Sequence, residues 1–166
     1  MKPALGVEAA REAALRLIER TRRTRSDLAR RLRDKGFAAA DIEPVLDRLA
    51  AVGLVDDIEY ARAFLAGRWG RRAAGWRRLE QDLRQRGVSA EDIAGGRARL
   101  EVEHGGPADE VAMARRVVEQ TARRYAGLEP HERRRKLWAL LARRGFSGDV
   151  IAQVVGAGST AVSPDV

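Results

Sequence analysis

The feature that most constrains the fold is an internal repeat centred on three glycines, Gly36, Gly87 and Gly145. The same residue types return at five offsets around each glycine, with no gap inside any copy. The glycines are 51 and 58 residues apart, so the repeating unit has about 50 residues. The matched columns lie eight and four residues before the glycine, one before it, one after it and six after it: Leu28, Leu79 and Leu137; Leu32, Leu83 and Leu141; Lys35, Arg86 and Arg144; Phe37, Val88 and Phe146; Ile42, Ile93 and Ile151.

Each copy predicts one helix that ends at the glycine and a second helix that follows it. Leucines four residues apart share one helical face. A glycine just beyond the last turn can adopt the left-handed conformation that ends a helix, and the helix dipole favours the basic residue before it. Ser89 and Ser147 stand where the following helix would be capped. A further apolar pattern, such as Ala10, Ala14 and Leu17, predicts a third helix before each pair.

These patterns predict an all-α chain of three tandem three-helix repeats that form an elongated, curved helical array. No alternating run of β-branched residues predicts a strand. A 50-residue unit buries only about 60% of its unfolded surface, so neighbouring repeats are expected to share apolar surface. The expected boundaries are a flexible N-terminus over 1–8, repeats over 9–52, 53–102 and 109–156, a loop over 103–108 and a disordered tail over 157–166. Gly95-Gly96 is expected to interrupt the third helix of the second repeat.

Composition excludes several classes of protein. The 166 residues include no cysteine and two histidines, which argues against a disulfide framework, a thiol nucleophile and a Cys- or His-rich metal centre. No stretch approaches the roughly 18 apolar residues of a membrane span, so a cytoplasmic protein with no membrane partner is expected. With 32 Lys+Arg against 24 Asp+Glu, the net charge of +8 indicates an acidic or polyanionic partner.

The positive charge follows the repeat. Residues 11–35, 60–86 and 123–144 each carry a net charge of +6, whereas residues 36–59 carry −5 and residues 87–122 carry −3. Each basic block contains a glycine-ended helix and the segment that leads into it. A solvated surface explains any single arginine, but clusters of like charge favour a surface that binds a partner.

The clustered cations are candidate partner-binding residues, because they are expected to lack matching acids four residues away, and one adjacent tryptophan joins them: Arg68, Trp69, Arg71, Arg72, Arg77, Arg78, Arg133, Arg134 and Arg135. Trp69 and Trp76 flank the densest stretch, and packing at the junction of the first two repeats is the favoured interpretation over a role as anchors. Trp138 aligns with Ala29 and Glu80 in the other repeats, so it is a candidate contact for a partner or a neighbouring repeat.

No constellation of residues predicts catalysis, and neither a cofactor nor a metal is expected. Asp56 and Asp57 stand directly before a helical pattern and are interpreted as helix caps. Glu101, Glu103 and His104 cluster without a second histidine at ligand spacing, so they do not predict a metal site. No phosphate-binding loop, dinucleotide fingerprint or nucleophile elbow is present. The chain is therefore interpreted as a binding protein and not an enzyme.

Three motifs connect the chain to a known family. Segment 53–64 reads Gly-Leu-Val-Asp-Asp-Ile-Glu-Tyr-Ala-Arg-Ala-Phe, segment 35–37 reads Lys-Gly-Phe, and segment 141–147 reads Leu-Ala-Arg-Arg-Gly-Phe-Ser. In these motifs, and in register with all three repeats from about Glu8 to Val155, the chain resembles the RecX family, regulators of the RecA recombinase. It departs from the family pattern at Gly95-Gly96 and in the loop over 103–107.

The resemblance implies a tandem array that binds RecA and its nucleoprotein filament and suppresses ATP hydrolysis, strand exchange and coprotease activity. A monomer is expected. It thereby implies a role in recombination and the DNA-damage response. The alternative is a sequence-independent nucleic-acid-binding protein of helix-turn-helix-like units, which would show a steep salt dependence on bare DNA. RecA binding with weak direct binding to DNA is the favoured reading. A purely structural helical adaptor would show neither effect.

Overall fold

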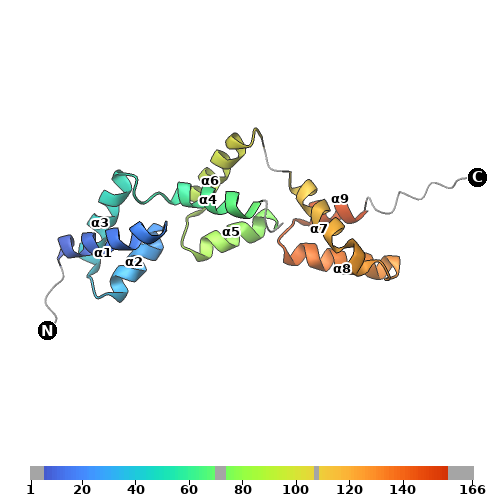
Figure 1. Cartoon of the computed structure of the whole chain (residues 1–166), viewed down its shortest axis with the longest axis horizontal. Coiled ribbons are helices and arrows are strands. Elements are labelled where there is room, and N and C mark those ends of the chain that lie inside the picture. The colour runs from blue at the N-terminus through green and yellow to red at the C-terminus, as the bar shows by residue number, and fades with distance from the viewer. Residues whose placement is uncertain (1–5, 70–73, 107–108, 157–166) are drawn as a thin grey trace, which may run out of the picture. The chain divides into compact units, whose positions relative to one another are not determined.

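The computed structural model describes residues 6–69, 74–106 and 109–156, and within these ranges every regular element is an α-helix (Figure 1). The predicted all-α fold is confirmed. Arg71 and Arg72, together with residues 1–5 and 157–166, lie outside the described residues. The helices are α1 (Val7–Arg20), α2 (Arg25–Asp34), α3 (Ala39–Ala51), α4 (Asp57–Trp69), α5 (Trp76–Gln85), α6 (Ala90–Glu103), α7 (Glu110–Tyr125), α8 (Pro130–Arg143) and α9 (Gly148–Gly156).

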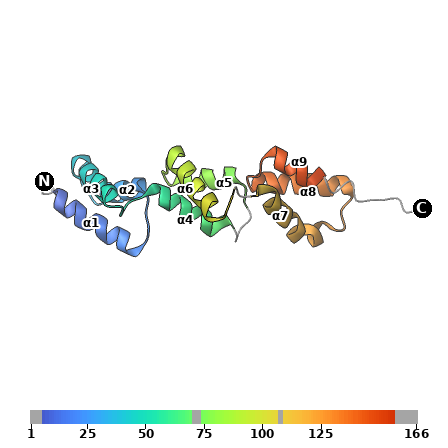
Figure 2. The same ribbon diagram turned by 90° about the horizontal axis from the view of Figure 1, so that it is seen from above.

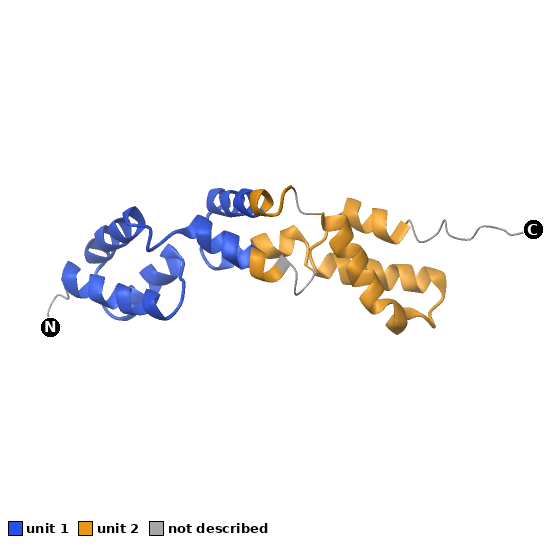
Figure 3. Ribbon diagram, turned by 45° about the horizontal axis from the view of Figure 1, so that its top comes forward, with its two compact units in different colours: residues 1–65, 83–100 blue, residues 66–82, 101–166 orange. Residues whose placement is uncertain are grey.

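The helices follow the repeat, and we refer to α1–α3, α4–α6 and α7–α9 as repeats 1, 2 and 3. Helix α1 begins at Val7, inside the segment that was expected to be flexible. Two compact units divide the chain (Figure 3): unit 1 comprises residues 1–65 and 83–100, and unit 2 comprises residues 66–82 and 101–166. The three helices of repeat 2 therefore contribute residues to both units.

Each unit has its own apolar core, built from the columns of the repeat. In unit 1, Leu28 and Leu32 of α2 are fully buried in one cluster with Ile42 and Leu46 of α3. In unit 2, α7, α8 and α9 pack together (Figure 2) around Val117, Leu141, Phe146 and Ile151. Burying one such side chain contributes about 1.5–3 kcal/mol. In repeat 2 the equivalent residues Leu79, Leu83 and Ile93 are also buried.

The three glycines of the repeat end their helices in the same way. Gly36, Gly87 and Gly145 have φ values of +92°, +77° and +85°, which L-residues with a side chain rarely adopt. In each copy the N–H of the following apolar residue donates to the carbonyl of the leucine four before the glycine, as from Phe37 to Leu32 at 3.2 Å. This is a Schellman ending, and it joins two columns of the repeat through one hydrogen bond. Ser89 Oγ then accepts from the N–H of Asp92 and caps α6 as expected.

The expectation that Gly95-Gly96 interrupts a helix is wrong, because α6 runs without a break through both residues. The reason for the glycines is close packing between helices. A Cβ on Gly96 would lie 2.6 Å from Ala61 Cβ and 2.8 Å from the carbonyl oxygen of Ile58, both on α4. Glycine costs roughly 1 kcal/mol in a helix interior, and here it allows the backbones of α4 and α6 to approach each other.

Candidate partner interface

Unit 1 contains a junction between repeats 1 and 2, made by the beginning of α2 and the residues that bound α4 and α5. We call Thr24, Arg25, Asp57, Arg86 and Gly87 the first junction. Thr24 Oγ1 donates to the carbonyl oxygen of Arg86 at 2.8 Å, and the N–H of Arg25 donates to Asp57 Oδ1 at 2.9 Å. Thr24 is 1% exposed, so its hydroxyl makes this bond away from water. The same hydroxyl accepts from the N–H of Asp27 and caps α2.

Unit 2 contains the equivalent junction between repeats 2 and 3. We call Gly75, Trp76, Glu110, Arg144 and Gly145 the second junction. The N–H of Gly75 donates to the carbonyl oxygen of Arg144 at 2.8 Å, and the N–H of Trp76 donates to Glu110 Oε1 at 2.9 Å. Each residue occupies the position of its counterpart in the first junction. In both places the first helical N–H of one repeat is capped by an acid of the next repeat.

The two junctions correct two sequence interpretations. Asp56 caps its own helix, since Asp56 Oδ1 accepts from the N–H of Glu59 at 2.8 Å, but Asp57 caps α2 of the preceding repeat. Burial raises the pKa of Asp57 above its ordinary value, although the hydrogen bond from Arg25 opposes the shift. Trp76 is buried and begins the helix of the second junction, so it belongs to the boundary of repeats 2 and 3 and not to that of repeats 1 and 2.

Repeats 1 and 3 each lack one of the groups that make these bonds. Asp57 and Glu110 are the first residues of α4 and α7, and the equivalent residue at the start of α1 is Val7. Arg25 and Trp76 are the first residues of α2 and α5, and the equivalent residue at the start of α8 is Pro130. A proline has no backbone N–H to donate. The junction pattern therefore ends at the first and third repeats.

Two of the predicted arginines of α4 and α5 lie close to one carboxylate in unit 2. Arg68 Nη1 lies 3.8 Å and Arg78 Nε lies 3.2 Å from Asp82, which is 13% exposed. Asp82 stands four residues after Arg78, so the expectation that this cluster lacks matching acids is wrong. Arg77 is exposed. Trp69 is the last residue of α4, and its side chain lies outside what the structure describes.

The predicted arginines of α8 differ from one another. Arg133 donates to the carbonyl oxygens of Leu128 and Ala126 at 3.3 and 3.5 Å, so it fixes the connection between α7 and α8. Lys136 pairs with Glu132 at 3.1 Å, which again supplies an acid four residues away. Arg134 and Arg135 are exposed, and no ion pair involves them within the described residues.

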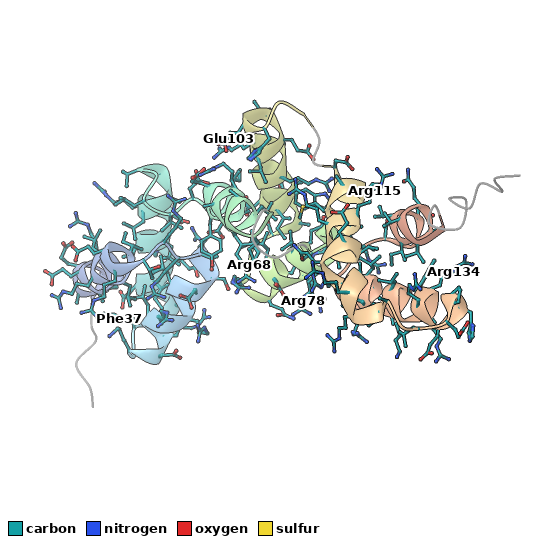
Figure 4. All side chains as sticks on the ribbon, turned by 45° about the vertical axis from the view of Figure 1, so that its right-hand side comes forward. Phe37, Arg68, Arg78, Glu103, Arg115 and Arg134 are labelled. Carbon is teal, nitrogen blue, oxygen red and sulfur yellow. The ribbon has the colours of Figure 1, made fainter. Side chains whose placement is uncertain are left out.

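The structure does not bring these two sets of arginines together. Arg78 lies against Gly145, just beyond the C-terminal end of α8, while Arg134 lies in the second turn of that helix (Figure 4). Ten helical residues separate Arg134 from Arg144, a rise of about 15 Å. They are therefore two separate candidate surfaces of unit 2.

Sequence reasoning missed a third basic surface, in unit 1. A cleft of about 530 Å³ lies beside the first junction, and its lining includes five arginines: Arg22, Arg23, Arg30, Arg84 and Arg86. The arginines come from the segment before α2, from α2 itself and from the end of α5. The alignment of the repeat contained the signal, because it placed basic residues before each glycine, but it gave no sign that two distant segments share one cleft.

The carboxylate of Glu59, in segment 53–64, accepts hydrogen bonds from nearby arginines. Glu59 accepts from Arg62 at 2.7 and 2.8 Å and from Arg22 at 2.9 Å. Hydrogen bonds from Arg62 and then Arg22 lower the pKa of Glu59 to about 2, against the opposing effect of burial. Glu59 is therefore a structural anion that connects α4 to the segment before α2.

Within the described residues, no group of three or more His, Asp or Glu side chains is arranged to hold a metal ion. In the same part of the chain, no helix is both long and apolar enough to cross a membrane.

Comparison with known proteins matches each repeat to one family. The family models for the first, second and third three-helix domains of RecX match residues 10–49, 56–95 and 108–155. The chain belongs to the RecX family. The match to the second RecX domain ends at Gly95, the first glycine of the pair in α6.

Relatives support the assignment over most of the chain. A protein of Thermobifida fusca called Regulatory protein RecX is 38% identical over 146 residues, covering 88% of this chain and 76% of that protein. Proteins with the same name from Mycobacterium leprae and Halorhodospira halophila are 39% and 38% identical and cover 89% and 90% of this chain. Of their own lengths, 84% and 88% are covered.

Two solved structures share the RecX fold. The crystal structure of RecX from Lactobacillus salivarius has a TM-score of 0.80 at 19% identity, covering 91% of this chain and 95% of that chain. A second crystal structure, of a regulatory protein RecX, has a TM-score of 0.78 at 24% identity, covering 91% of this chain and 73% of that chain. At these identities the likeness supports the fold alone.

Proposed function

We propose that this RecX-family chain is a non-enzymatic regulator that binds RecA recombinase and its filament on DNA. It inhibits ATP hydrolysis, strand exchange and coprotease activity by RecA, and so restrains recombination and the damage response in the cytoplasm. The observation that carries the proposal is that all three RecX domains match in order along one chain. The name of the relatives, Regulatory protein RecX, supports a regulatory role.

Helix α8 offers the surface on which we base the contact with RecA. Trp138 is 43% exposed, which is unusual for a tryptophan. Arg134 and Arg135 precede it by four and three residues, so the three side chains are neighbours on the helix surface. An exposed tryptophan beside arginines has the composition of an interface hot spot. Leu137 and Leu141 of the same helix are buried in the core of unit 2, so α8 is held in place while Trp138 stays exposed.

The deciding experiment measures the DNA-dependent ATPase of RecA with and without the full chain. Inhibition that saturates with increasing chain is expected, and no change at stoichiometric excess would refute the proposal. The surface is tested separately with Trp138→Ala and with the pair Arg134→Gln and Arg135→Gln. Removing an interface tryptophan typically costs 2 kcal/mol or more of binding, so the concentration for half inhibition should rise about thirtyfold.

A matched control loses the same charge elsewhere. Arg115 and Arg116 are exposed on α7, and no ion pair involves them within the described residues. The pair Arg115→Gln and Arg116→Gln should inhibit RecA like the unaltered chain. Equal loss in both pairs would mean that only total charge matters. Because Trp138, Arg134 and Arg135 are exposed, thermal unfolding should be unchanged in all these variants.

A further inference from the structure

The arginine cleft of unit 1 has a chemistry that the proposed regulation of RecA does not use. Besides its five arginines, the lining includes one acid, Asp27, and the hydroxyl-bearing residues Thr21, Thr24, Ser26 and Tyr60. We infer that this cleft is a binding site for the phosphodiester backbone of a nucleic acid strand. The inference does not rest on RecA binding, because the site is defined by this chain alone.

Positive charge exceeds negative charge around Asp27. Asp27 is shared by three guanidinium groups: Arg23 at 2.9 Å, Arg31 at 2.8 Å and Arg30 in very close contact. Their hydrogen bonds, led by that of Arg31, lower the pKa of Asp27 although burial opposes the shift. Arg23 and Arg30 line the cleft with Asp27, whereas Arg31 does not. One carboxylate cannot neutralise even two guanidinium groups, so this part of the cleft keeps an excess of positive charge.

Two guanidinium groups of the cleft, those of Arg22 and Arg30, keep N–H donors for a ligand. A guanidinium has five N–H donors. Arg30 uses one nitrogen on Asp27, and Arg22 uses one nitrogen on the carboxylate and carbonyl of Glu59. Both side chains are more than half exposed. Their remaining N–H groups face water and can bind phosphate oxygens in the forked geometry that arginine favours.

The first junction fixes the positions of the two walls of the cleft. Thr24 at the start of α2 is bonded to Arg86 at the end of α5 through the first junction. Arg86 also lies over the ring of Phe64, with its guanidinium carbon 4.8 Å from the ring centroid. Arginines on the two walls are thereby held on either side of one cleft, where they can bind successive phosphates. A nucleic acid strand carries one anion per nucleotide along its length, so it can meet cations that two separate segments contribute to one cleft.

The test measures binding of a fluorescein-labelled oligo-dT strand to the full chain, without RecA, over a range of salt concentrations. The variant is the pair Arg30→Gln and Arg84→Gln, both exposed and on opposite walls. For a single strand each lost phosphate contact reduces the slope of log K against log salt by about 0.7, so the pair should reduce it by about 1.4. The control pair Arg115→Gln and Arg116→Gln should leave the slope unchanged.

Two further measurements decide between explanations. Replacing the same residues by lysine keeps the charge, so Arg30→Lys with Arg84→Lys should keep most of the salt slope, while far-ultraviolet circular dichroism checks that all variants are folded. Equal slopes in the cleft and control pairs would overturn the inference. Unaltered DNA binding with lost inhibition of RecA would also overturn it, and would assign the cleft to an acidic protein surface. Lost DNA binding with normal inhibition would support the site and leave the proposed function intact.

Discussion

At the first junction a threonine hydroxyl donates to the carbonyl of Arg86, and at the second a backbone N–H donates to the carbonyl of Arg144. The distance is 2.8 Å in both cases. The second bond of each junction also matches, with Asp57 and Glu110 accepting at 2.9 Å. The repeat thus preserves a pair of hydrogen bonds and not the residues that make them.

The exchange of a threonine hydroxyl for a glycine N–H decides how closely the backbones of neighbouring repeats approach at each junction. At the second junction a Cβ on Gly75 would overlap the carbonyl of Gly145, so backbone meets backbone. At the first junction the Thr24 side chain stands between the two backbones, and the contact of Gly87 is with the side chain of Ser26. A contact through a side chain can adjust its rotamer, whereas a contact through backbone atoms cannot. The second junction should therefore tolerate substitution less well.

The largest expected effect is that of Gly75→Ala, which places a methyl group against the backbone of Gly145 and Phe146. Overpacking of this kind costs about 3 kcal/mol, and urea unfolding of the chain measures it. The control is Gly127→Ala, where a Cβ meets nothing within 4 Å, with an expected effect under about 0.5 kcal/mol. Identical midpoints for Gly75→Ala and the unaltered chain would contradict a fixed backbone contact.

The next effect is that of Thr24→Val, which keeps the shape of the side chain and removes its hydroxyl. The change leaves the carbonyl of Arg86 and the N–H of Asp27 without this partner in a buried site. The expected loss of stability is about 2 kcal/mol, measured by the same urea titration. Thr24→Ser keeps the hydroxyl and should lose clearly less. Similar losses in the two variants would mean that the methyl group, and not the hydrogen bonds, stabilises the first junction.

Smaller losses of stability are expected when the two capping acids, Asp57 and Glu110, are replaced, and the two losses should differ. Asp57→Ala removes the acceptor for the N–H of Arg25 and should cost about 1 kcal/mol. Asp57→Asn keeps an acceptor oxygen and, because burial already disfavours the charge, should cost less. Glu110→Ala should cost about 0.5 kcal/mol, since a longer side chain loses more rotamer freedom when it caps. Amide hydrogen exchange at Arg25 and Trp76 measures each bond, and faster exchange at the unaltered junction would contradict this assignment.

The smallest expected effect is a pH dependence of folding stability caused by Glu59. The equivalent residue in repeat 3 is Ala112, which does not titrate. Because the pKa of Glu59 falls from 4.5 to about 2 on folding, its ion pairs stabilise the protein above about pH 4.5. That contribution is lost as the pH falls from about 4.5 to about 2. Thermal unfolding across this range should therefore be less acid-sensitive in Glu59→Gln than in the unaltered chain. Equal acid sensitivity would remove Glu59 as a source of the effect.

Much of the fold could be predicted from local patterns. Leucines four apart, a glycine that ends the helix and a serine that caps the next helix are signals that lie within one segment of sequence. Asp56 could be identified as a cap for the same reason. The partner of Asp57 could not, because Arg25 lies 32 residues earlier and only folding brings the two together. The same limitation hid the arginine cleft, whose walls come from residues 21–30 and 84–87 with Tyr60 between them in sequence.

The sequence alone determined that the chain forms three similar helical repeats, because helix periods and helix ends depend on residues within one or two turns of each other. It also determined the periodic positive charge, which is a property of the order of residues along the chain. The tertiary structure decided which arginines are engaged by acids, which acid caps which helix, and why α6 contains two glycines. These outcomes depend on distances between backbones that are remote in sequence, and such distances are fixed only when the helices pack.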